Sequence, residues 1–534
     1  MKTTHYIILL VVAWLVPHAI YAQNSSDMTT QQLQKLLIAK SAISQLYVDS
    51  VDDKKVVEDA IKGMLENLDP HSSYTPAKDV KALTEPLEGN IEGIGIQYDI
   101  IEDTLIVVQT VSGGPSDKVG ILAGDRIVSV GDSNITGKKI NTDNVKQVLR
   151  GPKGSKVELG VVRKGVNGVN TFTVVRDKIP IYSIDAKYLI DKTTGYIRIN
   201  NFGATTHEEF VNAVKQLRKQ GMVDLIVDLQ SNGGGYLQAA VDIANEFLNQ
   251  GEMIVFTDGR AMPRREYRAD GHGILRDGRI IVLVDSYTAS ASEIVSGAIQ
   301  DHDRGVIIGR RTYGKGLVQR PIELPDGSLI RLTSAHYYTP SGRCIQRPYE
   351  KGNRQEYNRD IIARLNSGEL VNADSIHFTD SLRYTTLKNQ RTVYGGGGIM
   401  PDIYVPLDTT ALTTLYRNLQ AKSCISQTCI KYVEANRKSL KKQYPAFKDY
   451  QNRFSLPQEA VNMLLEHAKK AGVEYNDSTL AATMPKLSIH MKALIARHLW
   501  DINEYFQVIN LDNAIYQRAI ATIKEDEYDD KLSN

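Results

Sequence analysis

The fold of this chain is decided by Leu225-Ile226-Val227-Asp228-Leu229 and by the turn that follows it, Gln230-Ser231-Asn232-Gly233-Gly234-Gly235. The first five residues are a short, nearly continuous apolar run, and residues 236–248 after the turn have helical spacing. A strand that is apolar on both faces is typical of a parallel sheet covered by helices on each side. We therefore expect this segment to be a strand of an α/β core.

The same rhythm of strand and helix continues on either side of this segment. Residues 196–199 precede a helical stretch, residues 280–284 precede another, and residues 306–308 form a further apolar run. Repeated units of this kind predict a mainly parallel sheet, because each helix returns the chain to the start of the next strand. We assign residues 166–407 to this core.

Three regions flank or interrupt the core. Residues 23–85 have apolar side chains at spacings of three and four, which is typical of amphipathic helices. Residues 86–165 change to short β runs separated by glycine turns, with one helical stretch. Residues 408–534 are again helical, rich in lysine, and end in an acidic tail. We therefore expect a multidomain α/β protein: a mainly parallel core with an inserted β-rich domain and helical N- and C-terminal regions.

The composition excludes several classes of protein. Of the 534 residues, 42% are hydrophobic and 24% are charged, which is ordinary for a globular protein. The 64 basic residues nearly balance the 62 acidic ones, so the net charge does not point to nucleic acid. Three cysteines are too few for a disulfide framework in a chain of this length. Cys424 and Cys429 are close in sequence, and their pairing stays open.

The first 22 residues have the pattern of a cleaved secretory signal. A short basic start precedes the apolar residues 6–16, and polar residues follow the small residue Ala22. The apolar run is shorter than the ~20 residues that span a bilayer, which disfavours an uncleaved anchor. We therefore expect residues 1–22 to be removed and the protein to be exported to the periplasm, soluble or peripherally associated with a membrane.

Unusual sequences follow three of the expected strands. Residues 230–235 are rich in glycine, residues 285–293 hold a cluster of small hydroxyl side chains, and residues 309–316 carry Lys315. Because the carboxyl ends of parallel strands meet at one edge of a sheet, we expect these loops to converge there. Backbone N–H donors, a serine and a lysine would then lie together, and these are the parts of a Ser–Lys acyl-transfer site.

A Ser–Lys site requires a lysine with a lowered pKa. A lysine amine accepts the serine proton if burial lowers its pKa from ~10.4 to ~7–8. The residues that flank Lys315 are neutral, and Gln319 is close enough in sequence to accept a hydrogen bond from the amine. The developing oxyanion needs N–H donors, which the glycine turn and the amide after the nucleophile can supply.

Each of these features also has a purely structural interpretation. Ser290-Ala291-Ser292-Glu293 matches a capping box, in which Ser290 begins a helix and Glu293 reaches back to it. Lysines are mostly surface charges, and glycine runs are mostly turns. The residues alone therefore indicate a hydrolase with a Ser–Lys site and leave the capping interpretation open.

Two other kinds of hydrolase fit the sequence less well. A Ser–His–Asp triad with His207, His302 or His336 stays open, although no G-x-S-x-G turn occurs. His207 is followed by a glutamate, but Val211 stands where a zinc protease has its second histidine. A zinc protease is therefore not expected.

At these residues the sequence resembles the carboxyl-terminal processing peptidases, also called tail-specific proteases, from about residue 36 to residue 406. The family's nucleophile is the middle serine of a run of small residues, and its lysine lies in a segment matched by residues 312–319. The resemblance implies Ser290 as nucleophile, Lys315 as general base and Gln319 as the residue that orients the lysine. No metal or organic cofactor is implied. The implied oxyanion hole uses backbone N–H groups of Gly234, Gly235 and Ala291.

Residues 86–165 resemble the PDZ domain of that family. Gly113-Gly114-Pro115-Ser116 and Gly124-Asp125-Arg126-Ile127 match its core. The implied carboxylate-binding loop is Gly93, Ile94, Gly95 and Ile96. Such a loop presents N–H groups to a C-terminal carboxylate while the bound peptide adds a strand to the sheet.

The resemblance implies a serine endopeptidase that cleaves unstructured C-terminal segments of proteins. Its PDZ domain would recruit these segments and gate the active site. An adaptor or activator protein and a second copy of the chain, in a homodimer, are further expected partners, and nucleic acid is not.

The sequence departs from the family at the glycine turn. Gln230 stands where the family usually has an arginine, so that position lacks a charge-assisted anchor for the turn. This departure supports an alternative, a catalytically inactive PDZ scaffold that binds protein tails. Tail binding without turnover would distinguish the scaffold from the peptidase.

Overall fold

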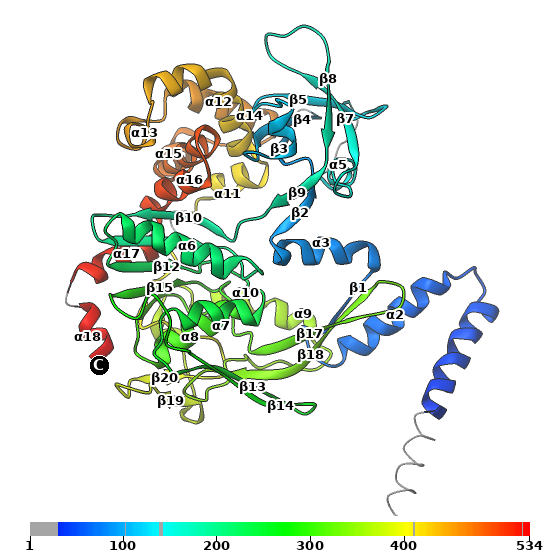
Figure 1. Cartoon of the computed structure of the whole chain (residues 1–534), viewed down its shortest axis with the longest axis vertical. Helices are drawn as coiled ribbons and strands as arrows, with labels where there is room; N and C mark the ends of the chain where they lie inside the picture. Colours follow the sequence, from blue (N-terminus) through cyan, green and yellow to red (C-terminus); the bar gives the residue numbers. More distant parts are fainter. Residues whose placement is uncertain (1–29, 102, 138–141, 410–411, 526, 534) are drawn as a thin grey trace, which may run out of the picture. The chain divides into compact units, whose positions relative to one another are not determined.

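The computed structural model describes residues 30–101, 103–137, 142–409, 412–525 and 527–533 (Figure 1). The expected signal peptide lies outside these residues. The chain divides into two compact units. The first contains the residues up to Val80 with Arg320–Leu332 and Tyr349–Tyr357. The second contains Lys81–Gln319, Thr333–Pro348 and Asn358–Asn534.

The first unit combines helices with a short strand pair. Residues 30–46 form a helix, and α2 (Asp53–Glu66) follows it. The Asp52 carboxylate accepts two N–H groups of the first turn of α2, which have no partner within the helix. β1 (Ser73–Thr75) pairs antiparallel with the start of β18 (Leu329–Tyr338).

The second unit is organised around a six-stranded sheet with the order β10-β11-β12-β15-β16-β21. β10 is antiparallel to β11, and the other strands run parallel to their neighbours. The predicted mainly parallel α/β core is therefore confirmed. Its strands are β10 (Ile184–Leu189), β11 (Thr194–Ile199), β12 (Asp224–Asp228), β15 (Ile280–Val284), β16 (Val306–Gly309) and β21 (Ile403–Tyr404).

One face of this sheet is covered by helices that alternate with its strands in sequence. Leu225 and Val227 of β12 belong to one hydrophobic cluster with buried side chains of these helices. Each apolar side chain removed from water in this way contributes about 1.5–3 kcal/mol to folding. The helices are α6 (Thr206–Lys219), α7 (Leu237–Asn245) and α8 (Ala291–Asp301).

The opposite face is covered by the end of the chain. Ile226, which lies between Leu225 and Val227, packs in a second cluster with Ile515 and Tyr516. These residues belong to α17 (Ala514–Lys524), and Tyr528 of α18 (Glu527–Ser533) joins the same cluster. Both faces of β12 are therefore buried, which explains why its sequence is apolar without alternation.

A β-rich domain precedes the central sheet. Its strand order is β3-β4-β5-β7-β8, with antiparallel neighbours, and it has its own buried cluster that includes Leu105, Ile121 and Leu159. A separate pair, β2 and β9, joins the start of the domain to its end. The elements are β2 (Asn90–Gly93), β3 (Ile96–Ile101), β4 (Thr104–Thr110), α4 (Pro115–Lys118), β5 (Arg126–Val130), β6 (Ser133–Asn134), α5 (Thr142–Leu149), β7 (Lys156–Val162), β8 (Asn170–Val175) and β9 (Asp177–Pro180).

The C-terminal region is a set of helices around a third core, in which Leu464, Leu487 and Met491 are fully buried. Cys424 and Cys429 both lie on α12 and are free thiols. The helices are α11 (Thr414–Ala421), α12 (Cys424–Gln443), α13 (Phe447–Arg453), α14 (Gln458–Lys470), α15 (Asp477–Leu499), α16 (Ile502–Ile509) and the short η3 (Asn510–Asp512).

Smaller elements complete the fold. They are α3 (Ala77–Glu88), β13 (Met253–Gly259), β14 (Met262–Arg268), β17 (Leu317–Glu323), α9 (Arg354–Asn358), α10 (Asp360–Asn366), η1 (Ala373–Ser375), η2 (Asp380–Leu382), β19 (Arg383–Thr385) and β20 (Thr392–Tyr394). Within the described ranges, no helix is both long and apolar enough to cross a membrane.

Candidate active site

Ser290 lies between β15 and α8, at the carboxyl edge of the parallel sheet. Its backbone has φ 58° and ψ −114°, a conformation that residues other than glycine rarely adopt. Strain of this kind costs about 1–3 kcal/mol and persists where the surrounding structure imposes it. The Ser290 hydroxyl makes no hydrogen bond that caps α8, although Glu293 accepts Ser290 N–H at 2.8 Å. Ser290 and Glu293 nevertheless stand in the arrangement of a capping box at the start of α8.

Lys315 lies in the loop between β16 and β17. Its Nζ donates to Gln319 Oε1 at 3.2 Å, and both side chains are half-buried. Gly314 has φ 82°, and a Cβ there would come within 3.0 Å of the backbone nitrogen of Gly398. The tight turn before the lysine therefore requires glycine.

A buried carboxylate connects the two loops. Glu293 is fully buried, and its Oε2 accepts the N–H of Ser290 at 2.8 Å and that of Lys315 at 2.9 Å. Its Oε1 accepts the N–H of Gly314 at 2.8 Å and the hydroxyl of Thr312 at 2.5 Å. Burial raises the pKa of Glu293, and these four hydrogen bonds oppose the rise. One side chain thus fixes the backbone of Ser290 and that of the Lys315 loop.

Tyr337 of β18 provides a second connection. Its hydroxyl lies 3.1 Å from the carbonyl oxygen of Ser290 and 2.7 Å from that of Lys315. The two residues therefore share partners through their backbones, while the hydroxyl and the amine are not bonded to each other. In active sites without substrate such bonds are often long and tighten when substrate binds.

The glycine turn packs directly against Ser290. Gly234 has φ 99°, and a Cβ there would lie 2.8 Å from Ser290 Cβ and 2.9 Å from Ala291 N. Gly234 N–H donates to Asn232 Oδ1 at 2.9 Å, so this donor is used within the turn. The N–H groups of Gly235 and Ala291 have no acceptor among the described residues. These two donors are available to an oxyanion, whereas Gly234 provides the close approach.

Side chains hold the turn against the loop that precedes Ser290. Asp285 accepts the N–H and the hydroxyl of Ser231, each at 3.0 Å. The Thr288 hydroxyl donates to the carbonyl oxygen of Leu229 at 2.8 Å. Thr288 stands at the first position of the run of small residues, and its hydroxyl is used in this contact.

The lysine loop has its own anchors. Arg364 of α10 is almost fully buried and donates to the carbonyl oxygens of Thr312 at 2.8 Å and Tyr313 at 3.2 Å. Arg311 forms a two-pronged ion pair with Glu369, at 2.7 Å and 2.5 Å. Bidentate pairs of this kind are among the strongest hydrogen bonds in proteins.

The candidate histidines do not join the site. Across the described residues, no histidine side chain is hydrogen-bonded to Ser290. His207 Nε2 lies 2.7 Å from Glu246 Oε1, and His302 Nε2 lies 2.7 Å from a backbone carbonyl. His336 belongs to β18. The geometry therefore gives no support to a Ser–His–Asp triad.

The expected carboxylate-binding loop lies at the edge of the β-rich domain. Gly93 ends β2, Ile94 is buried, and Ile96 begins β3. Gly95 has φ 72°, and a Cβ there would lie 3.0 Å from Ile179 Cδ1. β3 is the edge strand of its sheet, which is where a bound peptide can add a further strand.

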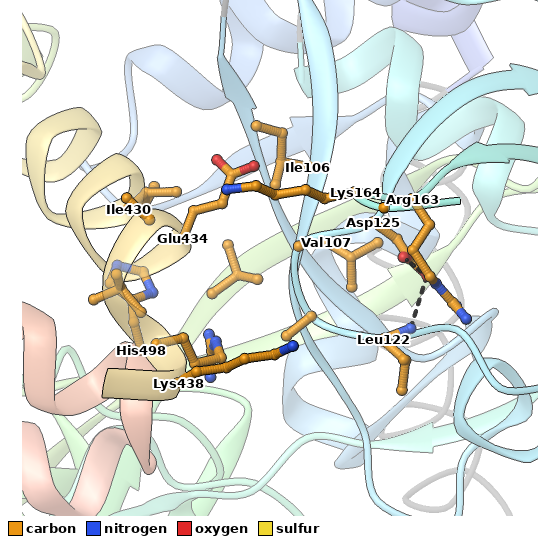
Figure 2. A pocket seen from close by; sticks show the side chains of 17 residues that line it. Ile106, Val107, Leu122, Asp125, Arg163, Lys164, Ile430, Glu434, Lys438 and His498 are labelled. Carbon is orange, nitrogen blue, oxygen red and sulfur yellow. Dashed lines mark hydrogen bonds and ion pairs between the residues drawn. The ribbon is translucent and has the colours of Figure 1, made fainter. Parts of the chain in front are cut away.

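The β-rich domain also contacts the C-terminal helices. Ile101 and Ile106 are buried together with Ile430 of α12. Arg126 Nη2 lies 3.0 Å from Glu434 Oε1, and both groups are partly exposed. A cavity of about 540 Å³ lies beside this contact, lined by residues of β4, of the loops around β5 and β7, and of α12 (Figure 2).

His498 of α15 lines the same cavity (Figure 2). Burial, together with the cations Arg497 and Arg437, lowers the pKa of His498 to about 4. The imidazole is therefore neutral at physiological pH.

The sequence pattern did not identify every residue that organises the site. Glu293 is marked only as a capping residue, although it is the one charged residue between Asp285 and Asp301 in sequence, which is a signal of a buried role. Asp285 and Tyr337 carry no such signal, because their roles depend on contacts between segments distant in sequence.

Comparisons with known proteins identify the families that parts of the chain match. Residues 193–352 match peptidase family S41, and residues 106–163 match a PDZ domain. Residues 16–79 match the N-terminal domain of the activating protease CtpB, and residues 415–501 match a family of unknown function.

Curated relatives cover most of the chain. The carboxy-terminal-processing protease of Bartonella bacilliformis is 38% identical over 329 residues, which are 60% of this chain and 74% of the relative. The carboxy-terminal processing protease CtpA of Bacillus subtilis is 32% identical over 344 residues, 64% of this chain and 72% of the relative. The solved structure of the photosystem II D1 C-terminal processing protease is 30% identical and covers 58% of this chain and 89% of its own, with a TM-score of 0.33. The resemblance seen in the sequence is confirmed: the chain belongs to the carboxy-terminal processing peptidases of family S41, which are serine-type proteases.

Proposed function

We propose that the protein is an exported serine endopeptidase that cleaves unstructured C-terminal segments of proteins with a Ser290–Lys315 dyad. The observation that carries this proposal is the Glu293 carboxylate, which binds the backbone N–H groups of both residues. A buried carboxylate that joins these two loops has a clear purpose if their side chains act together. A helix cap alone would not require the further hydrogen bonds that Glu293 accepts from residues 312–315.

In the proposed reaction, the neutral amine of Lys315 takes the hydroxyl proton of Ser290 as Oγ attacks the scissile carbonyl carbon. The tetrahedral intermediate collapses, the C–N bond breaks, and the leaving amine takes the proton from the Lys315 ammonium. A water molecule then hydrolyses the acyl-enzyme, with Lys315 again as base. Gln319 accepts a hydrogen bond from Nζ, which supports a role in orienting the amine without adding charge.

The oxyanion of the intermediate is proposed to bind the N–H groups of Gly235 and Ala291, which lack other acceptors among the described residues. Each such donor is worth about 2.7–4 kcal/mol in the transition state. Gly234 serves the same site by letting the turn approach Ser290.

The PDZ domain is proposed to recruit substrates by their free C-termini. Gly93, Ile94, Gly95 and Ile96 would receive the terminal carboxylate, and the peptide would extend along the edge strand β3. The contact of this domain with α12 through Ile430 and Glu434 supports a gating role, because tail binding can alter a contact that is partly exposed.

Export and dimerisation complete the proposal. The pattern of residues 1–22 supports cleavage and transfer to the periplasm. The helix of residues 30–46 leaves Leu33, Leu36, Leu37 and Leu46 between 54% and 81% exposed. Apolar exposure of this kind on one helix supports pairing with a second copy of the chain.

The test follows degradation of casein by protein that begins at residue 23, comparing wild type with Ser290→Ala and Lys315→Ala. Wild type alone should cleave, and the Ser290→Ala/Lys315→Ala double variant should lose no more activity than either single variant, because the residues act as a unit. Lys192→Ala, an exposed lysine at the amino edge of the sheet, is the control and should retain activity.

Two peptides distinguish recruitment by the PDZ domain from cleavage at Ser290. A peptide with a free C-terminal carboxylate should be cleaved faster than the same peptide with a C-terminal amide. Cleavage by Ser290→Ala would contradict the proposed nucleophile. Tail binding by wild type without any cleavage would instead favour the inactive scaffold.

A further inference from the structure

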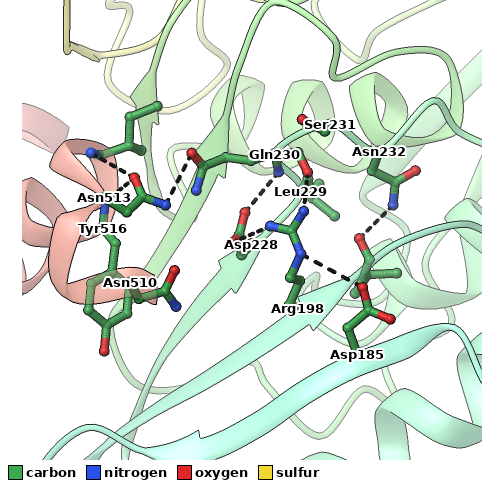
Figure 3. Close-up of polar contacts among 12 residues, drawn as sticks. Asp185, Arg198, Asp228, Leu229, Gln230, Ser231, Asn232, Asn510, Asn513 and Tyr516 are labelled. Atoms are coloured by element: carbon green, nitrogen blue, oxygen red, sulfur yellow. Dashed lines mark hydrogen bonds and ion pairs between the residues drawn. The ribbon is translucent and has the colours of Figure 1, made fainter. Parts of the chain in front are cut away.

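Gln230, the departure from the family pattern, carries no charge toward the glycine turn. Its side chain is 9% exposed, and its Oε1 accepts a hydrogen bond from Asn513 Nδ2 at 3.4 Å (Figure 3). Its Nε2 is buried without a hydrogen-bond partner among the described residues. The side chain therefore faces the start of α17 and gives the turn no charge-assisted anchor.

Arg198 supplies a guanidinium to the same place from the neighbouring strand. It lies directly opposite Asp228 in the register of β11 and β12, and its Nη1 is 2.7 Å from Asp228 Oδ2. Its Nη2 donates to the carbonyl oxygen of Gln230 at 2.8 Å, and Asp228 Oδ1 accepts Gln230 N–H at 2.8 Å. The Arg198–Asp228 pair thus binds both backbone groups of the first residue of the turn (Figure 3).

This pair is itself enclosed. Asp228 is fully buried and also accepts the Tyr196 hydroxyl at 2.5 Å. The guanidinium carbon of Arg198 lies 4.6 Å from the centre of the Phe506 ring on α16, a cation–π distance. The C-terminal segment therefore contacts the anchor through Phe506 and the Gln230 side chain through Asn513.

We infer that Arg198 is the positioning residue of the oxyanion turn, in place of a charged side chain at position 230, and that α16 and α17 complete its support. The inference rests on the proposed function, since a turn needs positioning only if its N–H groups act on substrate. Three successive glycines give the turn large conformational freedom, and a displacement of about 0.5 Å weakens an oxyanion hole. A charge-assisted hydrogen bond to its first carbonyl restricts that freedom.

The first test measures hydrolysis of a fluorogenic peptide with a free C-terminus by Arg198→Met and Arg198→Lys, normalised to folded protein. Arg198→Met should lower kcat by about tenfold to a hundredfold with KM within about twofold, because the loss falls on the transition state. Arg198→Lys keeps the positive charge but loses the planar, two-pronged donor geometry of the guanidinium. Its kcat should therefore lie between those of Arg198→Met and wild type.

Arg304→Met is the matched control. Arg304 is also largely buried and donates to backbone carbonyls, including those of Leu275 and Gly278, before β15 at the amino edge of the sheet. Its loss should lower stability and leave kcat unchanged. A kcat of Arg198→Met equal to that of wild type or of Arg304→Met would overturn the inference.

A second test does not depend on turnover. Amide hydrogen exchange of the full chain should speed up in residues 230–235 at least several-fold in Arg198→Met and less in Phe506→Leu, with no change there in Arg304→Met. Unchanged exchange in Arg198→Met would also overturn the inference. Absence of cleavage by wild type, in contrast, would count against the proposed function, so the two failures are distinguishable.

Discussion

The Lys315 loop and the glycine turn proposed to supply oxyanion donors leave the same edge of the same sheet, yet they are held differently. The lysine loop is anchored within the peptidase core by Glu293 and by the buried Arg364. The oxyanion turn is anchored at its first residue by Arg198, which in turn contacts Phe506 near the end of the chain.

The difference shows which part of the site is adjustable. The position of the lysine is set by a carboxylate with four donors, so it changes only if the core changes. The position of the turn depends on the Arg198–Asp228 pair at Gln230, on Asp285 at Ser231, and on helices more than 270 residues away in sequence, since Gln230 contacts Asn513. We therefore expect changes in the C-terminal helices to affect the turn more than the Lys315 loop.

The largest effect is expected from Glu293→Gln. This substitution removes hydrogen bonds that hold both Ser290 and the Lys315 loop in place. A glutamine offers one acceptor oxygen where the carboxylate accepts four hydrogen bonds, and buried donors left without partners cost about 1–3 kcal/mol each. We expect kcat/KM on the tail peptide to fall by about a hundredfold or more.

Glu246→Gln is the control for that substitution. Glu246 is buried and accepts the N–H of Ile274 at 2.9 Å, away from Ser290. It should destabilise the protein without lowering kcat. Equal activity losses in the two variants would mean that Glu293 has no special role in the site.

A smaller effect is expected from Arg364→Met, which loosens the lysine loop alone. The carbonyls of Thr312 and Tyr313 lose their donor, so Lys315 is held less firmly, and we expect a loss of about tenfold in kcat.

The pH dependence of kcat/KM sharpens the comparison of Arg364→Met with Arg198→Met. The midpoint of this pH profile should shift in Arg364→Met, because the surroundings of Lys315 change. It should stay unchanged in Arg198→Met. The same midpoint in both variants would contradict the separation of the two loops.

The smallest effect on activity is expected from His498→Asn, which tests the stability of the C-terminal helical region. The pKa of His498 is lowered from 6.5 to about 4, so the unfolded state binds more protons between these pH values. Stability from this group is therefore full above about pH 6.5 and is lost as the pH falls toward 4. At pH 5 the loss is about 2 kcal/mol relative to pH 7.

Urea unfolding at pH 7 and pH 5 measures this dependence. Trp500 is the only tryptophan after residue 22 and lies in the helical region, so its fluorescence reports the unfolding of that region. His498→Asn should lose about 2 kcal/mol less than wild type on acidification. Equal losses would show that His498 does not titrate as its burial implies.

The sequence is sufficient to predict the fold class of the core and the family, for identifiable reasons. The strand 225–229 is apolar at nearly every position because helices cover both faces of the sheet. Ser290 and Lys315 were found because short motifs carry them. The helices that cover the second face were not predictable as such, because α17 reaches the sheet from the end of the chain.

The residues that hold the site in place could not be predicted from the sequence, for a similar reason. Arg198 sits in an ordinary strand sequence, and only the register of β11 against β12 places it opposite Asp228. Glu293 has the sequence of a helix cap, and only the return of the chain at residues 312–315 gives its carboxylate further donors. Local patterns identify reactive residues, while tertiary contacts determine what holds them.

The most direct test of the dyad is labelling by a fluorophosphonate probe, followed by mass spectrometry of the modified peptide. The probe forms a covalent bond only with an activated serine. We predict that Ser290 is labelled in wild type, and that labelling is lost in Lys315→Ala at equal amounts of folded protein. Labelling at another serine, or equal labelling of Ser290 without Lys315, would contradict the dyad.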